Sequence, residues 1–120
     1  MSARRAEPAA REPDALDAAP VFAALGDATR LRLVARLVAD GPLSISSLTA
    51  GTDISRQAVT KHLQVLEHAG LARATRRGRE RLWALEPEPL DEARRALDDL
   101  SRQWDAALER LRRFVEEDGE

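Results

Sequence analysis

The sequence predicts a mainly α fold of the α+β class, in which five helices accompany a two-stranded β-hairpin. Three observations predict it: apolar residues recur at spacings of three and four over most of the chain, two strand-like runs flank a glycine turn, and the C-terminal part reads as one long amphipathic helix. A chain of 120 residues has room for one domain with one core. We expect this domain over residues 14–118, after a disordered leader over residues 1–13 that alternates charge, Ala and Pro.

The first three helices are predicted from apolar spacing and from capping residues. The first covers about Asp17–Leu25, and the second begins after Asp27, which can cap the first amides, and ends at Gly41. A brief helical turn then leads from Ser44 to Gly51, whose missing Cβ suits a tight bend between two helices.

The fourth helix is predicted over about Arg56–Ala69, with Ser55 as its N-cap and Gly70 as its left-handed stop. At about 100° per residue, its apolar residues gather on one side, and His62 falls among them. A buried, hydrogen-bonded histidine is therefore expected there, in preference to a ligand-binding one. The opposite side is polar and carries Arg56, Gln57, Thr60, Lys61 and Gln64.

The hairpin is predicted from two short runs, Leu71–Arg76 and Arg79–Leu85, around a turn at Arg77 and Gly78. The positive charge of the chain is concentrated in this region. Between residues 55 and 85 there are seven basic and two acidic residues, a balance of 7 − 2 = +5, although the whole chain carries −2. Such a local excess is typical of a surface that contacts phosphates.

The fifth helix is expected over residues 91–117, after Pro87 and Pro89 end the second strand. Its apolar residues alternate by three and four over more than three heptads, so this helix needs a partner helix. The residues expected in the contact are Leu97, Leu100, Trp104, Ala107, Leu111 and Phe114.

Several function classes are excluded by composition. There is no cysteine, so a disulfide framework, a thiolate metal ligand and a thiol nucleophile are all excluded. No apolar run approaches the ~20 residues that cross a bilayer, and we expect a cytoplasmic protein without a membrane partner. The two histidines lie on one helix and the serines are scattered, so no nucleophile is paired with a base, and we expect no enzyme.

The remaining pattern predicts a winged helix-turn-helix that binds double-stranded DNA. A helix, a glycine turn, an amphipathic helix with a polar outer face and a basic hairpin are the parts that docking in the major groove requires. Gln57 can pair with adenine, and Arg56 or Lys61 can contact guanine or phosphate. The alternative from another class is a winged-helix module that binds protein instead of DNA.

The chain also resembles a known family. The segments FAALGDATRLRLV, SISSL, ISRQAVTKHLQVLEHAGL and RRGRERLWALEPEPL are similar to the ArsR/SmtB family of bacterial winged-helix repressors, over nearly all of residues 16–115. The resemblance implies a homodimer built by the first and last helices, which adds Leu16 and Phe22 to the dimer contact. It also implies repression at near-palindromic operators. By matching position it implies that Gln57, Thr60 and Lys61 face bases or adjacent phosphates and that Arg76, Arg77 and Arg79 reach the flanking minor groove. With the polar face and the basic run added, the expected DNA contacts are Ser55, Arg56, Gln57, Thr60, Lys61 and Gln64 of the fourth helix, and Arg76, Arg77, Arg79 and Arg81 of the hairpin. PadR-like and MarR-like regulators are alternatives within the DNA-binding class.

The sequence departs from the family at the positions that bind metals. Ser44 and Ser46 stand where metal-sensing members carry paired cysteines, and the last helix contains no histidine. Its acidic residues Asp98, Asp99, Asp105 and Glu109 are interpreted as solvating charge on an exposed helix face and not as a cation site. We therefore expect the non-metal-binding type, without a cofactor. An effector, if the protein has one, would be a small molecule or a protein whose identity the sequence does not indicate.

Overall fold

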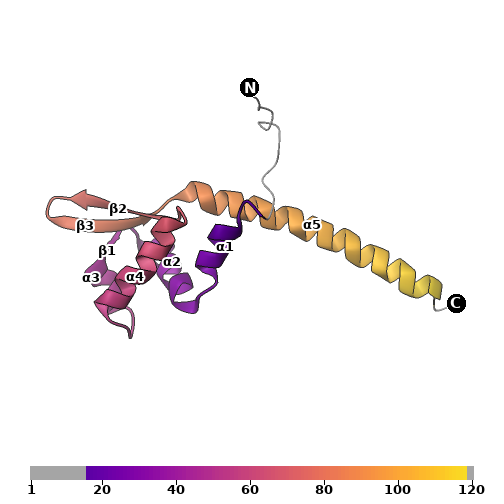
Figure 1. Ribbon diagram of the computed structural model, residues 1–120, viewed down its shortest axis with the longest axis horizontal. Helices are drawn as coiled ribbons and strands as arrows, with labels where there is room; N and C mark the ends of the chain where they lie inside the picture. The colour runs from indigo at the N-terminus through magenta and orange to yellow at the C-terminus, as the bar shows by residue number, and fades with distance from the viewer. Residues whose placement is uncertain (1–15, 119–120) are drawn as a thin grey trace, which may run out of the picture.

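The computed structural model of the chain describes residues 16–118, so the expected leader over residues 1–13 lies outside the described part (Figure 1). The five predicted helices and the hairpin are confirmed. In chain order the elements are α1 (Ala19–Leu25), α2 (Ala28–Asp40), β1 (Leu43–Ser44), α3 (Ile45–Ala50), α4 (Arg56–His68), β2 (Ala72–Arg77), β3 (Glu80–Leu85) and α5 (Pro87–Asp118).

The hairpin is part of a three-stranded antiparallel sheet in the order β1-β3-β2. The two-residue strand β1 joins the predicted pair, with Leu43 opposite Trp83 and Ser44 opposite Leu82. Two residues are too short to show the alternation by which a strand is recognised in a sequence. The third strand attaches the base of the hairpin to the start of α3.

The turn of the hairpin lies one residue later than predicted. Arg77 is paired with Glu80 and is the last residue of β2, so the two turn residues are Gly78 and Arg79, not Arg77 and Gly78. Gly78 has φ +62°, which suits the first central position of a type II′ hairpin turn. The correction places Arg79 at the tip and Arg77 within the ladder.

Local hydrogen bonds explain the helix ends that were predicted correctly. Asp27 Oδ2 accepts a hydrogen bond from the amide of Arg30 at 3.0 Å, which caps α2. At the end of α4, Gly70 adopts φ +81° and its amide donates to the carbonyl of Glu67, while the amide of Leu71 donates to the carbonyl of Leu66. This pair of bonds is a Schellman motif, which stops the helix and turns the chain into β2.

Helix α5 begins at Pro87, four residues before the predicted start at Asp91. Pro87 and Pro89 do not end the preceding strand from outside the helix. They lie in the first turn of α5, where amide groups have no intrahelical partner and proline is tolerated. The 32 residues of the helix span about 48 Å at ~1.5 Å per residue.

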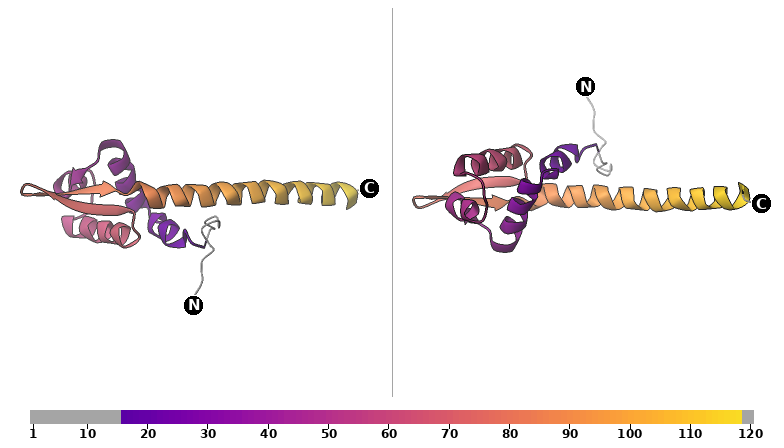
Figure 2. Two further views of the ribbon diagram at one scale, coloured as in Figure 1. Left: turned by 90° about the horizontal axis from the view of Figure 1, so that it is seen from above. Right: turned by 90° about the horizontal axis from the view of Figure 1, so that it is seen from below.

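The core lies where α2, α3, α4 and the sheet meet. Its fully buried side chains are Leu33, Leu48, Val59, Leu63, Leu66 and Leu71. Trp83 of β3 closes the core beneath the hairpin, and Ala93 and Ala96 attach the first turns of α5. Beyond these alanines α5 projects away from the rest of the described chain (Figures 1 and 2). Within the described residues, no helix is both long enough and apolar enough to cross a membrane.

Candidate nucleic-acid interface

Helix α4 is held by one face and exposed on the other. Val59, Leu63 and Leu66 are completely buried, and the helix packs against α1, α2, α3 and β2. Arg56 and Gln57, at its N-terminus, are exposed. The helix therefore presents its first turn outward from a fixed base, which is the geometry that groove reading requires.

Two of the predicted contact residues already use part of their hydrogen-bonding capacity inside the helix. Ser55 Oγ accepts a hydrogen bond from the amide of Ala58 at 3.1 Å as the N-cap. The hydroxyl of half-buried Thr60 donates to the carbonyl of Arg56 at 2.9 Å. Because a hydroxyl has one donor and two acceptor lone pairs, Thr60 can offer DNA an acceptor or its methyl group, but no donor in this rotamer.

Lys61 and Gln64 lie further along α4 and are both exposed. They also line a groove between α4 and α1, together with Val65 of α4 and Pro20 and Ala23 of α1. The polar face predicted from the sequence is therefore divided in the fold. Its N-terminal part is open to the surroundings, and its middle part borders α1.

The arginines of the hairpin are distributed over different faces. Arg76 and Arg81 are opposite each other and share the face of Trp83, because side chains alternate along a strand. The guanidinium carbon of Arg81 lies 5.5 Å from the centre of the Trp83 ring, a cation–π distance. Arg77 is on the other face, opposite Glu80, and Arg79 is in the turn. One cation at the tip, two on the Trp83 face and one on the other face make a basic edge and not a flat basic surface.

One arginine of the basic region is neutralised within the fold. Arg73 Nε lies 3.4 Å from Oε2 of Glu86, the residue that precedes α5. Arg73 is not among the predicted DNA contacts. Within residues 16–118, the cationic residues that are predicted contacts form no ion pair; they are Arg56, Lys61, Arg76, Arg77, Arg79 and Arg81. The local positive excess found in the sequence is thus mostly available to a polyanion.

A cluster of polar contacts around Arg30 and His62, here called the polar joint, connects α1, α2 and α4 beneath this surface. Arg30 Nε donates to the carbonyl of Ala24 at 2.6 Å, and its Nη1 lies 3.3 Å from Nδ1 of His62. Nδ1 of His62 is also 3.9 Å from Oδ2 of Asp27. The amide of Arg30 lowers the pKa of Asp27 below its usual 3.8 by hydrogen bonding, and the nearby guanidinium acts in the same direction.

The polar joint shows that one expectation, the full burial of His62, was wrong, and it adds Arg30 to the residues that support α4. His62 is hydrogen-bonded as predicted, but it is half-buried where full burial was expected, because it lies at the edge between α4 and the N-terminus of α2. Sequence reasoning missed Arg30, which ties the end of α1 and the start of α2 to α4. No local pattern reveals this contact, because Arg30 and His62 are 32 residues apart.

The outer part of α5 carries an exposed apolar stripe. At about 100° per residue, six of its side chains lie within about 80° of arc, and Ala107 and Phe114 lie on the edge. The six that form the stripe are Leu97, Leu100, Trp104, Leu108, Leu111 and Val115, all exposed. Leu108 and Val115 were not predicted, because the prediction followed a 3.5-residue repeat whereas a straight helix has 3.6 residues per turn. Of the first-helix residues predicted with them, Leu16 is 81% exposed and Phe22 packs against the core.

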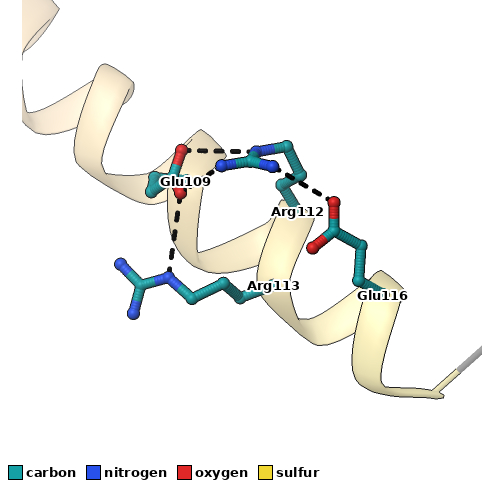
Figure 3. A network of polar contacts seen from close by, with 4 residues as sticks. All are labelled: Glu109, Arg112, Arg113 and Glu116. Carbon is teal, nitrogen blue, oxygen red and sulfur yellow. Dashed lines mark hydrogen bonds and ion pairs between the residues drawn. The ribbon is translucent and has the colours of Figure 1, made fainter.

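The charged side of α5 neutralises itself within the helix. Arg112 bonds to both Glu109 and Glu116, and Arg113 Nε lies 3.8 Å from Glu109 Oε2 (Figure 3). These residues are three or four apart, the spacing at which opposite charges support a helix. They leave the apolar stripe free of charge, as a helix contact requires.

Of the two serines that stand at the family's metal-binding positions, Ser44 has a structural role. Ser44 caps α3, accepting from the amide of Ser47 at 3.1 Å, and its hydroxyl donates to Ser47 Oγ at 3.2 Å. Ser46 is exposed. Across residues 16–118, no three His, Asp or Glu side chains are grouped so that they could hold a metal ion.

Comparisons with known proteins agree on one class. A helix-turn-helix domain family matches residues 25–74. The HTH-type transcriptional regulator Rv2034 of Mycobacterium tuberculosis is 37% identical over 97 residues, covering 81% of this chain and 87% of the relative. The solved structure of an ArsR-like transcriptional regulator from Rhodococcus sp. RHA1 is 34% identical, with a TM-score of 0.69, over 81% of this chain and 91% of that one. A second solved structure, of an ArsR family transcriptional regulator, is 32% identical with a TM-score of 0.64, over 72% of this chain and 89% of that one.

Proposed function

Because the chain belongs to the ArsR family of winged helix-turn-helix transcriptional regulators and is a DNA-binding protein, we propose that it acts as a homodimeric repressor on a two-fold symmetric operator. The observation that carries the proposal is the outward first turn of α4 beside a basic hairpin, of which Arg76, Arg77, Arg79 and Arg81 form no ion pair within the described residues. Helix α4 is held by three completely buried side chains, and the hairpin is anchored at its base by β1 and Trp83, so DNA meets a surface whose supports are already folded.

In this proposal α4 reads bases and the hairpin contacts the backbone. Gln57 forms two hydrogen bonds with an adenine edge, and Arg56 reaches a guanine or the adjacent phosphate. Lys61 neutralises a phosphate further along the helix. Arg77 and Arg79, at the outer end of the hairpin, reach the flanking minor groove and its phosphates.

The apolar stripe of α5 supplies the second half of the proposal. An exposed stripe of this length on one chain is covered when a second copy brings the same surface, which gives a two-fold contact. The dimer then holds two α4 helices about one DNA turn, ~34 Å, apart, so that each enters a major groove of the operator. Repression needs only that the bound dimer exclude the polymerase from an overlapping promoter.

The test is selection of binding sites from random duplexes by the purified chain, followed by affinity measurements at several salt concentrations. We expect an enriched site with two inverted half-sites and an affinity that falls steeply with salt. Gln57→Ala should lose about 1–3 kcal/mol of preference at one position of each half-site. Gln103→Ala, which changes an exposed glutamine of α5, is the matched control and should leave the site unchanged.

Two results would contradict the proposal in different parts. Enrichment of a single half-site without an inverted repeat would refute the two-fold operator. An unchanged preference in Gln57→Ala would refute the assignment of α4 residues to bases. A reporter fused to the selected operator tests repression, because its expression should rise when the gene for the protein is deleted.

A further inference from the structure

A groove of about 760 Å³ lies between α1 and α4, beside the predicted DNA-contact surface. We propose that it binds a small organic anion with an apolar body, and that the bound anion weakens DNA binding. The second statement rests on the proposed function, whereas the first can be tested without DNA.

The apolar part of the groove is made of small or short side chains. Pro20 and Ala23 contribute from α1, and Val65 and Ala69 contribute from α4. Val65 is 42% exposed, although the other large apolar residues of α4 are completely buried in the core. Packing within the described chain therefore leaves this surface uncovered, and an apolar ligand group of moderate size fits against it.

The charged side chains that line the groove are all basic, which favours an anionic ligand. Arg30 and Lys61 line it, and no Asp or Glu does, although the chain has 21 acidic residues and a net charge of −2. Asp27, which lies near Arg30, is not among the lining residues. An apolar body with a carboxylate at one end complements such a lining, since the charge is placed at one rim and the apolar surface fills the rest.

Arg30 is already fixed in position for this role. Its Nε donates to the carbonyl of Ala24, and its Nη1 is held against Nδ1 of His62. Its Nη2 forms no hydrogen bond or ion pair within residues 16–118. A guanidinium that is oriented before binding loses less entropy on pairing with a carboxylate than a free one does.

Lys61 connects the groove to DNA. Its ammonium is exposed, forms no ion pair within the described residues, and belongs to both the groove lining and the predicted phosphate contacts. A bound carboxylate neutralises this ammonium and places negative charge where a phosphate would lie. We expect the loss of one phosphate contact in each half of the dimer to lower operator affinity at least about tenfold.

The binding test uses 4-phenylbutyrate as the probe and calorimetry on the full chain. We expect saturable binding of one probe per chain. The uncharged 4-phenylbutanol and the short carboxylate acetate should each bind at least about tenfold more weakly. Ala23→Trp, which fills the groove, and Lys61→Met, which removes the charge, should each weaken probe binding to a similar degree. Ala35→Trp places the same side chain on an exposed position of α2 outside the groove and is the matched control.

The outcomes separate the two statements and the proposed function. Equal binding of the alcohol and the carboxylate overturns the choice of an anion. Absence of probe binding, with a shift of the monomer–dimer equilibrium in Ala23→Trp, overturns the ligand site because a second copy then covers the groove. Probe binding without any fall in operator affinity overturns the coupling to DNA. A chain that binds the probe but no DNA sequence contradicts the proposed function and leaves the ligand site supported.

Discussion

Leu111 belongs to the apolar stripe on the outer part of α5, and we predict that Leu111→Ala weakens the proposed dimer without unfolding the chain. The side chain is 56% exposed in one chain. Burying a fully exposed leucine contributes about 1.5–3 kcal/mol, so covering its exposed part beyond Cβ contributes about 1 kcal/mol. A two-fold contact contains the residue twice, which gives about 2 kcal/mol and a roughly 30-fold weaker dimer.

The assay is sedimentation velocity over a range of concentrations, with circular dichroism to check the helix content. Alanine has the highest helix propensity, so a weaker dimer in Leu111→Ala cannot result from a weakened helix. Arg113→Ala is the control, because it removes a side chain from the charged face of the same helix, and should change the dissociation constant less than about threefold. A Leu111→Ala dimer as tight as the unaltered one would refute the assignment of the apolar stripe to the dimer contact.

Three further predictions concern the helix ends and the hairpin. Gly70→Ala should lower the free energy of unfolding by about 1–2 kcal/mol, because its φ of +81° strains a residue with Cβ, although that Cβ would meet only Pro89 Cγ at an ordinary 3.7 Å. Gly26→Ala, at negative φ, should cost less in the same urea titration. Asp27 stabilises α2 as a carboxylate with a lowered pKa; its contribution is present above pH 3.8 and is lost as pH falls through the lower folded pKa. The difference in urea midpoint between the unaltered chain and Asp27→Ala should therefore shrink below pH 3.8, and a constant difference would contradict the capping role. Arg77→Ala and Arg79→Ala should each weaken binding to all DNA sequences and reduce the slope of log affinity against log salt by about 1, whereas loss of preference at a single base pair would mean that these arginines read bases.

The parts of the fold that were predictable are those specified by neighbouring residues. The caps at Asp27 and Ser55 each depend on a side chain and an amide three residues later. The stop at Gly70 depends on the one residue type that adopts positive φ without strain. Such signals are complete within one turn of helix, so a single sequence contains all the information they need.

The parts that were not predictable depend on partners distant in the chain or on a choice between adjacent registers. Strand β1 forms because Leu43 pairs with Trp83, which lies forty residues later in the chain. The turn shifted by one residue because both Arg77–Gly78 and Gly78–Arg79 contain the required glycine, and the ladder of β2 with β3 decides between them. The division of the polar face of α4 has the same origin, since only the position of α1 shows that Lys61 borders a groove.

Helix α1 is the element through which the two predicted surfaces, for DNA and for a second chain, can affect each other. It packs against α5, which carries the apolar stripe, and against α4, which carries the predicted base contacts. Its last turn is tied to α2 and α4 by Arg30, through the carbonyl of Ala24 and through His62. A seven-residue helix has little stability of its own and takes its position from these contacts. We therefore expect a change at the predicted dimer contact or in the groove that displaces α1 to displace the support of α4 as well, whereas the hairpin is held separately, by β1 and by Trp83 in the core.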